Sequence, residues 1–209
     1  MSEWLEQAGR RFARLATRAS VARPGLWRIF RRPLQAQFDR LAPVWEQRAG
    51  PEALVPLTAA LERIETPPAR VLDLGTGTGK AARVAARLFS EAEVEAVDLA
   101  PAMVEEAQRL LPADLAGRVR FRVADASALP YESGAFDLVV LQNMIPFFDE
   151  LGRVTASGGR VVFAFSWGAE TPIYVPPETL RERLGAVGFE RFEEVAAGSG
   201  TAFVAYRIE

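Results

Sequence analysis

The sequence predicts an α/β fold built on a doubly wound, mostly parallel sheet, with an antiparallel hairpin at its C-terminal end. Two observations carry this prediction. From about residue 67 onwards, short apolar runs alternate with amphipathic stretches of helical period. The last two such runs are rich in apolar and β-branched residues and are separated by only Ser199 and Gly200, which is typical of a hairpin. Counting the hairpin, the sheet should have seven strands.

The expected elements follow one another in a regular order. Strands are expected over residues 70–75, 94–99, 119–125, 136–142 and 158–167, and the hairpin over 191–198 and 201–209. Helices are expected over residues 79–89, 101–111, 149–155 and 176–189. Pro101 suits the first turn of its helix because proline has no backbone N–H to leave unpaired. Gly188 marks the end of the last helix.

Residues 1–66 differ from the rest and are expected to form a helical N-terminal arm or cap, while residues 67–209 form the domain. A break at Arg23-Pro24-Gly25 divides the arm, and a further amphipathic helix is expected near residues 52–64. One helical face of the first segment is expected to be apolar: Trp4, Leu5, Ala8, Phe12, Leu15 and Ala16.

Composition limits the chemistry. The 209 residues include no cysteine and no histidine, which excludes disulfides, thiolate metal sites and histidine general bases, and no metal site is expected. Residues 1–48 carry ten arginines against four acidic residues, whereas the whole chain has a net charge of −2. The sequence contains neither a long apolar run nor a secretion signal, so we expect a cytoplasmic protein whose basic arm allows peripheral contact with a membrane.

The stretch VLDLGTGTGK, residues 71–80, is typical of a nucleotide-binding loop. An ATP-binding P-loop requires four residues between its glycines and a hydroxyl after the lysine, and the loop here is too short and has Ala81 instead. A dinucleotide-binding loop requires a third glycine where Lys80 stands, which leaves a nicotinamide oxidoreductase as a weak alternative. Lys80 itself is expected to lie in solvent.

Three further segments agree with this loop in order and spacing. Asp98 lies 23 residues beyond Gly75 at the end of VEAVDL, Asp125 ends VRFRVAD, and residues 124–140 read ADASALPYESGAFDLVV. Together they resemble the class I S-adenosylmethionine-dependent methyltransferases, and in particular the group related to ubiquinone and menaquinone biosynthesis. The segment QFDRLAPVWEQ, residues 37–47, resembles the segment that precedes the domain in this group, with Trp45 in place of a tyrosine.

The resemblance implies a Rossmann-like fold, S-adenosyl-L-methionine as cofactor, and a role for each matching residue. The glycine loop would approach the methionine part, whose amino group Asp73 would help hold. Asp98 would bind the ribose, Leu99 would lie against the adenine, and Asp125 and Ala126 would bind the adenine edge. Gln142 and Trp45 would border the methionine part. The implied cofactor residues are Trp45, Asp73, Gly75, Thr76, Gly77, Gly79, Asp98, Leu99, Asp125, Ala126 and Gln142.

Each residue also has a simpler explanation. The glycines suit a tight turn, Asp98 suits the N-terminal cap of the next helix, and Asp125 suits a turn. Asp137 begins a strand instead of ending one, so it is expected to be structural.

The methyl acceptor should meet the loops at 142–151 and 166–177. Their side chains are mostly apolar or aromatic, and they form either an acceptor pocket or a cover over the core: Met144, Ile145, Phe147, Phe148, Trp167 and Tyr174. Asn143 lies near the asparagine of the N-P-P-Y signature of amino-group methyltransferases, but that signature is absent. Asp149 and Tyr174 are the candidate proton acceptors.

The expected function is methyl transfer from S-adenosylmethionine to a small-molecule or lipid-like acceptor. A sulfonium cofactor carries the difficult chemistry, so the absence of histidine is compatible with catalysis. The alternatives are an S-adenosylmethionine-binding protein without catalysis, and methylation of a nucleic acid or a protein. No nucleic-acid partner is expected, because the chain has no recognition domain. The oligomeric state is not predicted.

Overall fold

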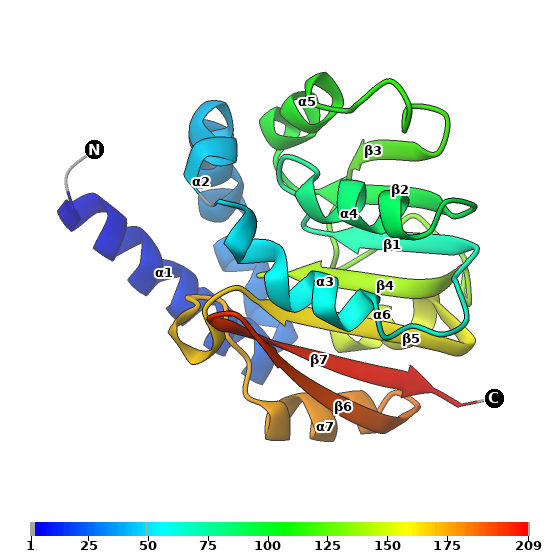
Figure 1. Ribbon diagram of the computed structural model, residues 1–209. Helices are drawn as coiled ribbons and strands as arrows, with labels where there is room; N and C mark the ends of the chain where they lie inside the picture. Colours follow the sequence, from blue (N-terminus) through cyan, green and yellow to red (C-terminus); the bar gives the residue numbers. More distant parts are fainter. Residues whose placement is uncertain (1–2, 49, 209) are drawn as a thin grey trace.

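The computed structural model describes residues 3–48 and 50–208. Its centre is a seven-stranded sheet of order β3-β2-β1-β4-β5-β7-β6 (Figure 1). Strands β1 to β5 are parallel, and β7 runs antiparallel to both β5 and β6. This confirms the predicted sheet and its C-terminal hairpin. The order reverses direction on either side of β1, and such a switch point is where open α/β sheets bind ligands, at the carboxyl ends of the strands.

The observed elements lie within a few residues of the expected ones. The strands are β1 (Arg70–Leu74), β2 (Glu93–Asp98), β3 (Val119–Val123), β4 (Phe136–Gln142), β5 (Thr155–Phe165), β6 (Phe189–Ala197) and β7 (Gly200–Arg207). The helices are α1 (Glu3–Ala22), α2 (Trp27–Arg48), α3 (Val55–Leu61), α4 (Lys80–Leu88), α5 (Pro101–Arg109), α6 (Phe148–Val154) and α7 (Pro177–Gly185). Three short 3-10 helices, η1 (Pro24–Leu26), η2 (Pro51–Leu54) and η3 (Gly168–Glu170), complete the described elements.

Two apolar layers enclose the sheet. On one face α3 and α4 pack against Val71, Leu138 and Val162 of the central strands. On the other face α6 and α7 pack against residues such as Leu72 and Phe163, and side chains of α1 and α2 join the same apolar cluster. The alternation of side chains along each strand supplies one set of residues to each layer.

Asp137 accepts hydrogen bonds from two backbone N–H groups at the start of β1, which is the structural role expected of it.

The arm contacts the domain along its length. The 3-10 helix η1 separates α1 from α2 at the predicted break, and α2 continues through Pro33 and Pro43. Figure 1 shows α2 at the end of the sheet toward which β1 to β4 point. The helix α3, which falls within residues 1–66, packs on the sheet through Leu57 and Leu61. Among the described residues no helix is long and apolar enough to cross a membrane.

The predicted apolar face of the first helix is partly wrong. Leu15 is 58% exposed, whereas the buried side chains of α1 are small: Ala13, Ala16, Thr17 and Ser20. Small side chains let the helix approach the domain closely, so the contact face lies to one side of the most hydrophobic stripe. The side chains of Trp4 and Leu5 lie outside the described residues.

Candidate functional site

The loop between β1 and α4 contains three glycines with positive φ. The φ values are +70° for Gly75, +54° for Gly77 and +83° for Gly79. A Cβ at Gly75 would lie 2.5 Å from Met144 Sδ, and a Cβ at Gly77 would lie 3.1 Å from Trp45 Nε1. Glycine at these two positions therefore lets Met144 and Trp45 approach the backbone of the loop closely, and we call this part of the loop the glycine cradle. Gly79 differs, because its Cβ would lie 2.7 Å from the ring of Phe121 on β3. Its lack of a side chain serves the packing of α4 against the sheet.

Asp73 ends β1 beneath this cradle and is 1% exposed. Its Oδ2 accepts a hydrogen bond of 2.6 Å from the hydroxyl of Thr76. Its Oδ1 is buried and has no hydrogen-bond partner in the described part of the chain. Burial raises the pKa of this carboxyl to about 7, the Thr76 hydroxyl and the backbone N–H of Ala82 oppose the shift, and the nearby charge of Asp98 adds to it.

Gln142, at the end of the neighbouring strand β4, has a similar unmet acceptor. Its Nε2 donates to the carbonyl oxygen of Ala53 and to Ser166 Oγ, at 3.0 and 2.8 Å. Its Oε1 is buried without a donor among the residues that the structure describes. Parallel strands end at the same edge of a sheet, so two unpaired acceptors from β1 and β4 lie on the same side of the molecule.

Asn143 adopts a φ of +52°, the one positive value outside glycine in the described residues. Its Nδ2 donates to Ser166 Oγ at 2.8 Å, and its Oδ1 accepts from the backbone N–H of Ser166 at 3.0 Å. Both ends of the amide thus connect the end of β4 to the end of β5. Left-handed backbone at a non-glycine residue is uncommon and needs such support.

Asp98 ends β2 and faces the glycine loop. Its Oδ2 accepts from the backbone N–H of Gly77 at 2.8 Å, and its Oδ1 accepts from that of Ala100 at 2.9 Å. The second bond closes a turn before α5, but the N-terminal cap of α5 is Ala100 without a side-chain hydrogen bond, so Asp98 is not the helix cap of the simpler explanation. Burial raises the pKa of Asp98, and the bonds from Ala100 and Gly77 oppose the shift. Leu99 is partly buried beside it.

Asp125 follows β3 and is already surrounded by donors. Its Oδ1 accepts from Trp27 Nε1 at 2.9 Å and from the backbone N–H and hydroxyl of Ser127 at 2.9 and 2.7 Å. Its Oδ2 accepts from Arg31 Nη1 at 3.1 Å. Burial alone would raise the pKa of Asp125, but the bonds from Ser127, Trp27 and Arg31 outweigh it and lower the pKa. Ala126, next to it, is buried.

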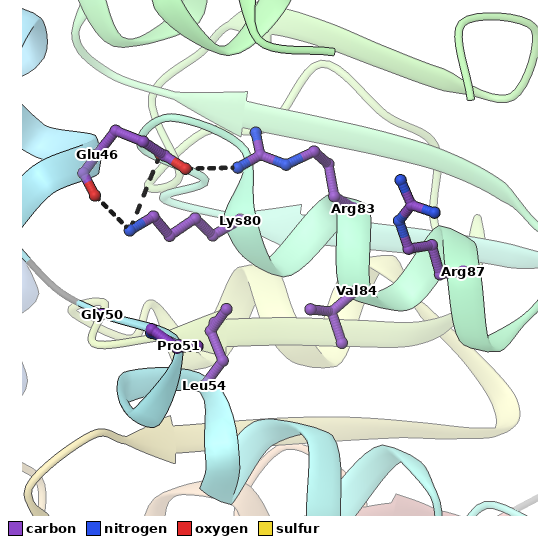
Figure 2. A pocket seen from close by; sticks show the side chains of 8 residues that line it. All are labelled: Glu46, Gly50, Pro51, Leu54, Lys80, Arg83, Val84 and Arg87. Carbon is purple, nitrogen blue, oxygen red and sulfur yellow. Dashed lines mark hydrogen bonds and ion pairs between the residues drawn. The ribbon is translucent and has the colours of Figure 1, made fainter. Parts of the chain in front are cut away.

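The end of α2 meets the other side of the glycine loop, where the Trp45 side chain lies beside Gly77. Glu46 accepts from the hydroxyl of Thr78 at 2.6 Å and from Arg83 Nη2 at 3.0 Å, and its carbonyl oxygen accepts from Lys80 Nζ at 2.8 Å. The expectation that Lys80 extends into solvent is therefore wrong, because its ammonium group is bonded to α2. Figure 2 shows the interactions that join Glu46 to Lys80 and to Arg83 as dashed lines.

A pocket of about 420 Å³ opens beside these residues. Figure 2 shows its lining: Glu46, Gly50, Pro51, Leu54, Lys80, Arg83, Val84 and Arg87. Four of its lining residues belong to α4, and none of the residues that the resemblance implies for the cofactor lines it. In the described part of the chain no three acidic side chains are grouped so as to hold a metal ion.

Comparison with known proteins identifies the family. Residues 71–162 match the model of a methyltransferase domain. The chain is 40% identical over 167 residues to a malonyl-[acyl-carrier protein] O-methyltransferase of Halorhodospira halophila. The matched region covers 76% of this chain and 53% of that protein. It is 43% identical over 107 residues to a demethylmenaquinone methyltransferase of Thermus thermophilus, covering 47% and 48% of the two chains. The chain belongs to the class I S-adenosylmethionine-dependent methyltransferases.

The fold agrees with this family. Phosphoethanolamine N-methyltransferase 2 of Haemonchus contortus, solved with S-adenosyl-L-methionine, superposes with a TM-score of 0.65 at 19% identity, covering 82% of this chain and 57% of that one. The cofactor of the family is the one that the sequence implied. The chain spans about half the length of the relatives named above.

The side chains of the loops expected to meet the methyl acceptor divide into two groups according to their burial. Ile145, Phe147 and Phe148 are each less than 9% exposed and join the core, so for these three the simpler explanation applies. Met144 and Tyr174 are partly buried, and Trp167 is 37% exposed at the edge. These three side chains remain open to a ligand.

The two candidate proton acceptors lie in different surroundings. Asp149 is an exposed residue in the first turn of α6. Tyr174 packs edge-on against Phe165 with ring centroids 5.0 Å apart. Burial and the charges of Glu178 and Glu194 raise the pKa of Tyr174, so its phenol stays protonated at neutral pH.

Proposed function

We propose that this protein transfers the methyl group of S-adenosylmethionine to a small-molecule or lipid-like acceptor. The observation that carries the proposal is the pair of unpaired buried acceptors, Asp73 Oδ1 and Gln142 Oε1, beside the glycine cradle. A buried acceptor without a donor is costly, and the ammonium group of the cofactor's methionine part offers the missing donors. These residues fit the family's cofactor.

In this proposal, the other parts of the cofactor bind residues at or just after the carboxyl ends of the strands. Asp98 accepts hydrogen bonds from the ribose hydroxyls, while Leu99 packs on the adenine. Asp125 accepts from the adenine amino group and the backbone N–H of Ala126 donates to the ring. The loop at Gly75 and Gly77 admits the methionine part, which Trp45 covers. Thr76 donates a hydrogen bond to Asp73 and so holds the carboxylate that binds the methionine part.

The chemistry demands little of the side chains. S-adenosylmethionine, when bound, supplies a methyl group already activated by its sulfonium. The chain contributes position and exclusion of water, and a well-aligned displacement can gain roughly 7–11 kcal/mol from proximity alone. With Asn143 committed to Ser166 and the Tyr174 phenol protonated, we propose that neither acts as a strong base. Asp149 stays a candidate for proton transfer to solvent.

The proposed acceptor is apolar or lipid-linked. Met144 and Trp167 offer an apolar surface at the edge of the site. Two relatives are named for the methylation of malonyl-[acyl-carrier protein] and of demethylmenaquinone, which supports a small group carried on a larger or apolar body. Methylation of a nucleic acid has no support of this kind from the domain.

Two measurements test the proposal in sequence. Titration calorimetry should give binding of S-adenosylhomocysteine and none of NADPH; the opposite preference would revive the oxidoreductase alternative. Transfer of a radiolabelled methyl group to a panel of quinol, phenol, amine and carboxylate acceptors should then give turnover with at least one apolar member. Cofactor binding without turnover across the whole panel would favour the non-catalytic alternative.

For the partner, we propose that the exposed face of the arm rests on an anionic membrane surface. Along residues 7–48 the acidic side chains are Asp39 and Glu46, and both are bonded to the domain. The exposed side of α1 instead carries three arginines around one apolar residue: Arg11, Arg14, Leu15 and Arg18. Ile29, 65% exposed between Arg28 and Arg32, repeats this arrangement on α2. Trp27 is buried and takes no part, and Phe30 is partly buried.

Vesicle sedimentation tests this partner. Each basic residue near an anionic surface contributes about 1 kcal/mol, and an inserted leucine or isoleucine adds hydrophobic contact. The protein should sediment with vesicles containing phosphatidylserine and much less with pure phosphatidylcholine. Substitution of Leu15 and Ile29 by glutamate should abolish the difference, while the same exchange at Val123, an exposed residue of β3, serves as the control. Equal sedimentation of all variants rejects membrane contact.

A further inference from the structure

The helix α2 reaches three segments that follow strands of the sheet. Near its start, Trp27 and Arg31 bond to Asp125 after β3. In its second half, Asp39 Oδ1 accepts from the backbone N–H of Ala102 after β2, at 3.1 Å. At its end, Glu46 bonds to Thr78 after β1. One helix therefore spans the region between the residues assigned to the two ends of the cofactor.

The contact at Asp125 fixes the orientation of its carboxylate. Three donors converge on Oδ1, from Trp27 and twice from Ser127, whereas Oδ2 receives the single bond from Arg31. A carboxylate oxygen accepts about two hydrogen bonds. Oδ1 is therefore fully used, and the remaining acceptor capacity of the group lies on Oδ2.

Trp27 is itself held firmly. Its side chain is 6% exposed, and its ring packs edge-on against Phe147 with centroids 5.1 Å apart. Phe147 belongs to the loop after β4, so the indole bridges that loop and the turn after β3. Arg31 is less restrained, because 44% of its side chain is exposed. Trp27 thus supplies a hydrogen bond from a fixed position, and Arg31 supplies a positive charge from a more exposed side chain.

We propose that Trp27 and Arg31 are positioning residues of the adenine site, which hold Asp125 so that Oδ2 faces the adenine amino group. This inference rests on the proposed function, in which Asp125 binds the adenine. It adds that the arm is part of the cofactor site although it precedes the domain in sequence. Since the same bonds hold α2 in place, cofactor binding and docking of the arm must stabilise each other.

The test compares two ligands that differ at one group. S-adenosylhomocysteine carries the adenine amino group, and its 6-deamino analogue, in which unsubstituted purine replaces adenine, carries a hydrogen atom there, which cannot hydrogen-bond to Asp125; N1 is an acceptor in both. The wild type should bind the adenosyl compound about tenfold more tightly, the value of one hydrogen bond to a charged group. Trp27→Phe keeps the packing on Phe147 and removes the N–H donor. It should reduce this preference to less than about threefold.

Arg31→Gln provides a second variant in case Trp27→Phe folds poorly, and thermal melting checks both. It should also reduce the preference, with Arg32→Gln as its matched control, because Arg32 is an exposed neighbour with the same charge. A merely structural role would weaken both ligands equally and leave their ratio unchanged, and that result overturns the proposal. Failure of the wild type to bind either ligand would instead reject the proposed function.

Limited trypsin digestion gives the reciprocal measurement. Residues 1–48 of the arm contain ten arginines, so trypsin reports on its docking. S-adenosylhomocysteine should slow cleavage within residues 10–48 of the wild type severalfold, and less so in Trp27→Phe. Equal protection of the two proteins contradicts the linkage between arm and cofactor.

Discussion

Asp73 and Asp125 are assigned to opposite ends of the proposed cofactor site, and their pKa values are shifted in opposite directions. Asp73 is 1% exposed with one strong donor, and its pKa is raised to about 7. Asp125 is also removed from water in part, yet Ser127, Trp27 and Arg31 surround it and its pKa is lowered. Burial thus raises the pKa of a carboxyl group only where hydrogen bonds and positive charges do not repay the lost hydration.

The difference also separates two ways of building a binding site. The end near Asp73 is formed by the backbone of one short loop and leaves an acceptor without a donor. The end near Asp125 is completed by side chains from a helix almost a hundred residues earlier in the chain. The first end has an unpaired acceptor that suits a ligand's positive charge, and the second already contains a positive charge of the protein.

The largest effect is expected from Asp98→Ala, because Asp98 stands between the two ends. It would remove the acceptor proposed for both ribose hydroxyls, and hydrogen bonds to a charged group are worth about 1.5–3 kcal/mol each. We expect the affinity for S-adenosylhomocysteine to fall at least about 100-fold by calorimetry.

The control for this change is Asp114→Ala, since Asp114 is an exposed acid whose side chain is 65% accessible and lies 3.8 Å from Arg87. It should bind the cofactor as the wild type does. If Asp98→Ala also retains its affinity while its melting temperature drops, the residue only caps the turn before α5 and the ribose assignment is wrong.

The next effect concerns Asp73 and pH. Binding of an ammonium group requires the ionised carboxylate, and the ionised fraction of a group with a pKa of about 7 rises from about a tenth at pH 6 to about nine tenths at pH 8. The affinity for S-adenosylhomocysteine should therefore rise roughly tenfold over this range. Asp73→Asn should bind weakly at both pH values. Affinity of the wild type that is flat with pH would contradict the assignment.

Stability without cofactor should change in the opposite direction. The folded pKa of Asp73 lies above its unfolded value of 3.8, so between these values the folded state binds more protons than the unfolded one. The free energy of unfolding should fall as the pH rises from about 4 to about 7, and Asp73→Asn should reduce this slope. The chain has no histidine to obscure the measurement, although Asp98 adds a shift of the same sign.

Most of the fold and part of the site could be predicted from the sequence, for physical reasons. Alternating apolar periods reveal strands and helices, and acids at the ends of parallel strands must share one edge, which brought Asp73, Asp98 and Asp125 together. The contacts of the arm could not be predicted, because nothing in the local sequence of Trp27 or Arg31 indicates a partner 98 or 94 residues away. Likewise, the small buried face of α1 is decided by the surface on which the helix packs.

The smallest effect is expected from Thr76→Val, which keeps the shape of the side chain and removes the 2.6 Å hydrogen bond to Asp73 Oδ2. That bond lowers the pKa of Asp73, so its loss should raise the pKa further and move the midpoint of the binding profile to higher pH. At pH 7 the affinity should fall about threefold, as expected for a modest pKa rise. Thr78→Val is the matched control, since the Thr78 hydroxyl bonds to Glu46 instead. A profile whose midpoint moves equally in both variants would mean that α2, and not Asp73, governs how cofactor binding depends on pH.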